Sequence, residues 1–144
     1  MSGRAGLMAI AAVFAFPSLA SAATPRAKAH ALLSGCYSAV LHLPVVAVRL
    51  NTPEVAMANR RVNPANARCN IAPRIDDLAF AHGSDKELAD AYAAAALLEL
   101  GVGDYVQYLT DAAFGHNNRT ELRRAIRETT SGKSLAVAAL RKLH

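Results

Sequence analysis

The feature that most constrains this chain is a run of small and apolar residues in its middle, between positions 83 and 101 (GSDKELADAYAAAALLELG). Apolar residues recur there with helical spacing. Since nothing from Ala91 to Leu98 is charged, we expect that half of the helix to be enclosed on nearly all sides. Ser84 and Glu87 have the spacing of a capping box, and Gly101 suits the left-handed residue just past a helix end. The pattern predicts a central helix from Ser84 to the residue before Gly101, closely approached by its neighbours.

The first 22 residues have the parts of a secretory signal peptide. A short basic segment is followed by an apolar run of about ten residues up to Pro17, and Ala20–Ala22 fits the small-x-small rule for cleavage before Ala23. The run is shorter than the roughly 20 residues that span a bilayer, which favours a cleaved signal over an uncleaved anchor. No later stretch approaches that length. We therefore expect an exported protein, periplasmic or secreted, with a single helical domain over residues 23–144.

The chain has two cysteines, Cys36 and Cys69, and no tryptophan. An isolated pair in an oxidising compartment most often forms a disulfide, and closing this loop would stabilise the fold by roughly 3.5–4 kcal/mol in the chain-entropy model. The alternative is a free thiol or half of a metal site, which no C-x-x-C or nearby histidine spacing supports. The sequence predicts one disulfide, which would support a core built mainly from alanine, leucine and valine.

The remainder of the chain also has mostly helical signals, giving an all-α bundle of about five to seven short helices. Val45–Leu50 is β-branched enough for a strand, but it has no evident strand partner, so a helix is favoured. Two prolines and three asparagines within 62–73 indicate an irregular loop. Besides the central helix, the predicted helices cover residues 27–41, 52–61, 76–83, 105–114, 118–130 and 131–143, with Thr52, Asp76 or Asp77, Asp104, Asn118 and Ser131 as their caps.

Charge is sharply segregated along the chain. Residues 26–74 contain seven basic residues and one acidic residue, residues 76–111 contain eight acidic and one basic, and residues 119–142 contain seven basic and two acidic. One interpretation is intramolecular, with an acidic middle packed between basic ends, and exposed pairs of this kind are each worth only about 0–1 kcal/mol. The other interpretation is a basic face that binds an acidic partner.

The most regular part of that basic face is a row of arginines at four-residue intervals: Arg119, Arg123 and Arg127. Arg124 can instead pair with Glu121 or Glu128. Tyr105 and Tyr108 share a helix face and could join the row in a contact surface, although a core role is more common at such spacing. The expected partner is another protein, with an anionic envelope surface as the second choice. Export and the absence of interleaved aromatic residues disfavour nucleic acid.

Motifs for catalysis, metals and cofactors are not found. The sequence lacks G-x-S-x-G, H-E-x-x-H, C-x-x-C-H and a calcium loop, and its five histidines are scattered. The best group of titratable residues is His82 with Asp76, Asp77 and Asp85, although helix caps explain such carboxylates more simply. We therefore predict no catalytic residue, metal or cofactor.

The resulting prediction is an exported helical binding protein, such as an adaptor, an inhibitor or an immunity protein. The alternatives are a basic protein that attaches to an anionic envelope surface and a small hydrolase with its site near His82.

Overall fold

The computed structural model describes residues 22–144, and within that range it contains helices and no strand, which confirms the all-helical prediction. Residues 1–21, which hold nearly all of the predicted signal peptide, lie outside the described residues. The helices are α1 (Pro25–Leu41), α2 (Pro53–Cys69), α3 (Ala72–Ala81), α4 (Lys86–Ala113) and α5 (Arg119–Leu140).

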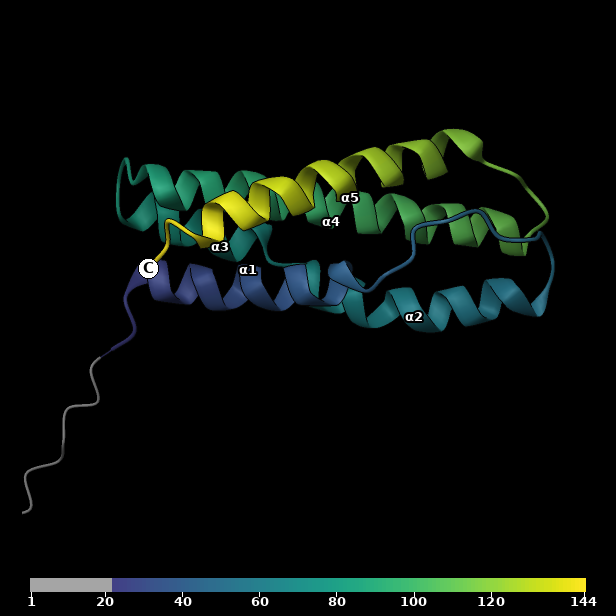
Figure 1. Ribbon diagram of the computed structural model, residues 1–144, viewed down its shortest axis with the longest axis horizontal. Helices are drawn as coiled ribbons and strands as arrows, with labels where there is room; N and C mark the ends of the chain where they lie inside the picture. The colour runs from purple at the N-terminus through teal and green to yellow at the C-terminus, as the bar shows by residue number, and fades with distance from the viewer. Residues whose placement is uncertain (1–21) are drawn as a thin grey trace, which may run out of the picture.

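Helix α4 is the centre of the arrangement, because it packs against each of the other four helices. Figure 1 shows α4 and α5 running antiparallel along the long axis, with α1 and α2 following one another along the opposite side. The apolar spacing noted in the sequence supplies the buried face of α4, including Leu88, Ala91, Ala95 and Leu98. The predicted central helix is therefore present. Its cap is Asp85, not Ser84, and the Asp85 carboxylate accepts hydrogen bonds from the Glu87 and Leu88 amides.

Two predicted breaks are wrong, since α4 and α5 are each one continuous helix. Gly101 was expected to end the central helix, but it lies buried within α4. A Cβ placed on it would lie 2.7 Å from the Thr129 backbone nitrogen, and one placed on Gly132 of α5 would lie 2.9 Å from the Leu98 nitrogen. These glycines allow the two backbones to come into contact where α4 and α5 cross. Asp104 and Ser131 accordingly lie inside helices and cap neither.

The loop predicted over 62–73 is largely helical, because α2 continues through Pro64 to Cys69. Val62, Ala65 and Cys69 are buried at spacings of three and four residues, which extends the packed face, whereas Pro64 is exposed on the solvent side. Helix α3 then starts at Ala72, whose amide donates to the Glu99 carboxylate at 3.1 Å. That contact, made across to α4, takes the place of the predicted caps Asp76 and Asp77.

The Cys36–Cys69 disulfide is present, as predicted. It joins the middle of α1 to the last residue of α2, and both cysteines are buried. The cross-link therefore ties the two helices that lie along the side of the molecule opposite α5.

Residues 43–50 form neither a helix nor a strand, so the favoured helix over Val45–Leu50 is wrong. This segment, which we call the strap, crosses from the end of α1 towards the start of α2 (Figure 1). Just past its far end, the Asn51 amide donates a hydrogen bond to the Ala112 carbonyl of α4, at 3.1 Å. The strap is held by partners that lie some 60 residues away, which local spacing does not reveal.

Candidate contact surface on helix α5

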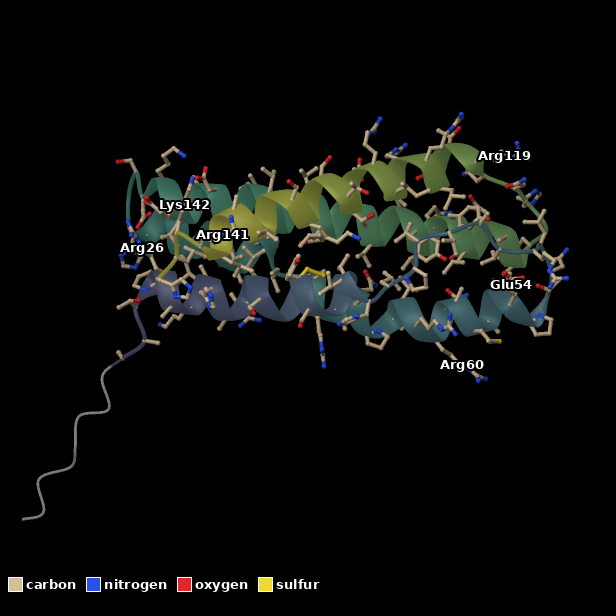
Figure 2. All side chains as sticks on the ribbon, in the orientation of Figure 1. Arg26, Glu54, Arg60, Arg119, Arg141 and Lys142 are labelled. Atoms are coloured by element: carbon tan, nitrogen blue, oxygen red, sulfur yellow. A yellow bond between two sulfur atoms is a disulfide. The ribbon has the colours of Figure 1, made fainter. Side chains whose placement is uncertain are left out.

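The two faces of α5 have different chemistry. Small and apolar residues at spacings of three and four, such as Leu122, Ala125, Ala136 and Ala139, are buried in the bundle. Arg119, Arg123 and Arg127 are exposed and lie at four-residue intervals, so they follow one another along the solvent side. Figure 2 marks Arg119 at the start of α5. The structure thus keeps the predicted arginine row together on one open face.

The acidic residues of α5 lie to one side of this row. Glu121 and Glu128 are only partly exposed and lie along the edge where Asp104 of α4 is placed. Arg124 bridges that edge, with its guanidinium 3.5 Å from the Asp104 carboxylate and 3.3 Å from that of Glu121. The predicted pairing of Arg124 with Glu121 is confirmed. Arg124 is therefore used within the protein and does not belong to the open row.

The arginine row carries charge that is barely compensated. Within residues 22–144, neither Arg119 nor Arg123 forms an ion pair, and Arg127 has only a long contact of 3.9 Å with Glu128 while remaining 73% exposed. The pKa of Glu128 is raised, first because burial disfavours its charged form and then because of the neighbouring Asp104 carboxyl. The row is a positive surface that is open to a partner.

Tyr105 and Tyr108 do not belong to this surface, because both are buried in the core. Their near-parallel rings lie 6.0 Å apart, and their hydroxyls hold the strap. The Tyr105 hydroxyl donates to the Val46 carbonyl at 3.1 Å, and the Val48 amide donates to the Tyr108 hydroxyl at 3.0 Å. Burial also raises the pKa of Tyr105. The prediction that these tyrosines contact a partner is wrong: their phenol groups satisfy strap backbone atoms that would otherwise lack partners.

Of the predicted group around His82, only His82 and Asp85 line a hollow at one end of the bundle, together with Arg26 and His144, whereas Asp76 and Asp77 do not line it. Asp85 is fully engaged there. One of its oxygens caps α4, and the other lies 2.9 Å from the Arg26 guanidinium, whose second branch lies 3.0 Å from Glu87. The hydrogen bond from Arg26 lowers the pKa of Asp85. A carboxylate with a lowered pKa and both oxygens occupied is a poor general base.

Residues 22–144 contain neither a membrane-spanning helix nor a cluster of metal ligands. No helix within this range is long and apolar enough to cross a membrane. The range also brings together no group of three or more histidine, cysteine, aspartate or glutamate residues that could hold a metal ion. In comparisons with known proteins, no protein-family model, curated protein or solved structure matches this chain.

Proposed function

We propose that this protein is an exported helical binding protein that contacts an acidic surface of another protein through the arginine row of α5, Arg119, Arg123 and Arg127. An adaptor, an inhibitor or an immunity protein would act through a protein contact of this kind. The observation that carries the proposal is the separation of charge on one helix. The three arginines of the row are exposed, whereas Glu121 and Glu128 are partly buried along the edge next to Asp104 of α4.

The spacing of the row suits a protein partner. Residues four positions apart on a helix are about 6 Å apart along its axis, so the three guanidinium groups can meet carboxylates spread over about 12 Å of a facing surface. Each guanidinium presents a fork of donors that binds one carboxylate with two hydrogen bonds. The long antiparallel contact with α4 holds α5 along its length, so the row is presented on a stiff support.

Attachment to an anionic envelope surface is the second candidate, since lipid headgroups would meet the same arginines. The two candidate functions predict different responses of binding to salt. Exposed charges separated by more than a Debye length are largely screened, and that length falls from about 10 Å at 0.1 M to about 3 Å at 1 M. Attachment through exposed charges alone should therefore be lost as salt rises, whereas a packed protein interface should persist.

The experiment compares two variants with the same change in net charge. Arg123→Glu/Arg127→Glu reverses the row, and Arg60→Glu/Arg68→Glu reverses two exposed arginines of α2, on the other side of the molecule, where Figure 2 marks Arg60. Each oxidised mature protein is immobilised and used to capture partners from the native envelope fraction at low and high salt. Anionic vesicles are tested in parallel.

We expect the row variant to lose the captured protein while the α2 variant retains it, with both variants keeping the wild-type helical circular dichroism. Equal capture by the row variant and the wild type would exclude this face. Binding to vesicles that disappears at high salt, without a captured protein, would favour the second candidate. Mass spectrometry of the exported protein tests the export itself: the chain should begin at Ala23 and be lighter by the two hydrogens lost in the disulfide.

A further inference from the structure

The strap encloses a small cavity against α2 and α4, and no residue of α5 lines it. Its volume is about 80 Å³. Leu43, Val46 and Val48 of the strap line it together with Met57 of α2 and Tyr105 of α4. Because the wall comes from three separate elements, the cavity exists only when the strap is fixed by its hydrogen bonds to Tyr105 and Tyr108.

The entrance to this cavity is also apolar. Val46 and Met57 both line the cavity, yet each is 52% exposed to solvent. Apolar side chains that lie partly in a cavity wall and partly in water offer contact area to an apolar group that enters from outside. The wall and the entrance together favour an apolar occupant over an ion or a sugar.

Charge at the entrance to the cavity adds a second requirement for the occupant. Glu54 and Arg61 both line the cavity, two helical turns apart on α2. The Glu54 carboxylate is already used, since it accepts from the Arg49 guanidinium at 3.3 Å and from the Arg49 amide at 3.4 Å. Arg61 forms no ion pair among the residues that the structure describes. The entrance therefore has one uncompensated positive charge beside an apolar space.

We propose that this cavity binds a short branched aliphatic group that carries a carboxylate, with the branched end inside and the carboxylate on Arg61. The volume of the cavity limits the size of the group that can enter it. An engineered cavity of about 150 Å³ holds benzene, whose ring has six heavy atoms, so a cavity of about 80 Å³ holds about three heavy atoms, the size of an isopropyl group. A free branched short-chain acid and the C-terminal residue of a peptide that ends in leucine or valine both present this chemistry.

The test is a titration of the isotope-labelled, oxidised mature protein followed by amide chemical shifts. The probes are isovalerate, isoamyl alcohol (the uncharged alcohol with the same carbon skeleton), a tripeptide ending in leucine, and the same tripeptide with an amidated C-terminus. We expect saturable shifts confined to the strap and to α2 around Met57 and Ala58, with dissociation constants in the millimolar range, as suits so small a ligand. Isovalerate should bind at least several-fold more tightly than the alcohol.

Two variants separate recognition by Arg61 from general effects of charge. Arg61→Gln should weaken binding of isovalerate about tenfold, because a charge-assisted hydrogen bond is lost. Arg60→Gln removes the neighbouring exposed arginine, which does not line the cavity, and should leave the affinity unchanged. Ala58 also lines the cavity, so Ala58→Leu extends a side chain into it and should abolish the shifts while the protein keeps its helical circular dichroism.

The outcomes are distinct. Tighter binding of the tripeptide than of isovalerate, with loss on amidation, identifies a peptide C-terminus as the source of the ligand, and the reverse order identifies a free acid. Equal affinity for acid and alcohol, or an unchanged affinity in Arg61→Gln, would overturn the assignment of Arg61. If none of the probes gave saturable shifts, the proposal that this cavity is a binding site would be overturned. None of these results depends on the arginine row of α5.

Discussion

Two glycines that lie two positions apart on α4 are expected to respond to alanine in opposite directions. A Cβ on Gly101 would lie 2.7 Å from both the Thr129 backbone nitrogen and its Cγ2, and 3.2 Å from the Glu128 carbonyl carbon. A Cβ on Gly103 would meet nothing within 4 Å, and Gly103 is exposed. The two substitutions thus make the same chemical change in the same helix and differ only in what faces the new methyl group.

The magnitude follows from two opposed effects. Alanine is favoured over glycine in a helix interior by about 1 kcal/mol, so Gly103→Ala should stabilise the protein by about 0.5–1 kcal/mol. At Gly101 the same gain is present, but the methyl group meets backbone atoms of α5, which cannot rotate away. Overpacking typically costs about 1–3 kcal/mol, and contact with a backbone belongs at the upper end. We expect Gly101→Ala to be destabilised by a net ~2 kcal/mol.

The assay is urea unfolding of the oxidised proteins, followed by far-ultraviolet circular dichroism. The midpoint should fall for Gly101→Ala and rise for Gly103→Ala, with unchanged slopes, since the area exposed on unfolding hardly differs. Gly132→Ala tests the same contact from α5, because its Cβ would lie 2.9 Å from the Leu98 backbone nitrogen. If Gly101→Ala is as stable as the wild type or more stable, the backbones of α4 and α5 do not touch at this crossing.

Three further predictions concern the strap, the partly buried carboxyl of Glu128 and the cross-link. Tyr108→Phe removes the acceptor of the Val48 amide, so the free energy of unfolding should fall by about 1 kcal/mol and that amide should exchange faster with deuterium; unchanged exchange would contradict the role of the phenol. The pKa of Glu128 is raised above its ordinary 4.5, so its ionised form costs stability at neutral pH. Glu128→Gln should therefore unfold at higher urea than the wild type at pH ~7, and this advantage should vanish below about pH 4.5, whereas a constant advantage would point to packing. Replacing Cys36 and Cys69 together by alanine should lower stability by roughly 3.5–4 kcal/mol, and a loss well below 1 kcal/mol would show that the remaining contacts of α1 and α2 suffice.

The all-helical class, the buried face of α4 and the arginine row could be predicted from the sequence because they depend on local spacing, whereas several helix ends could not. Apolar residues three and four positions apart share one helix face wherever the helix lies, which is why the buried side of α4 and the common face of Arg119, Arg123 and Arg127 were foreseen. The Cys36–Cys69 disulfide was foreseen for a different reason: with two cysteines in the chain, one intramolecular pairing is possible.

The roles of Gly101, Tyr105 and Tyr108 were decided by the tertiary structure. A glycine either ends a helix or admits a neighbour, and at Gly101 the choice depends on Thr129, which lies on another helix. The two tyrosines form one helical face in either case, and burial beneath the strap removes them from the surface. Spacing along a chain determines which residues share a face. What covers that face is settled by segments distant in sequence, so the strap and the cavity beneath it appear only once the chain has folded.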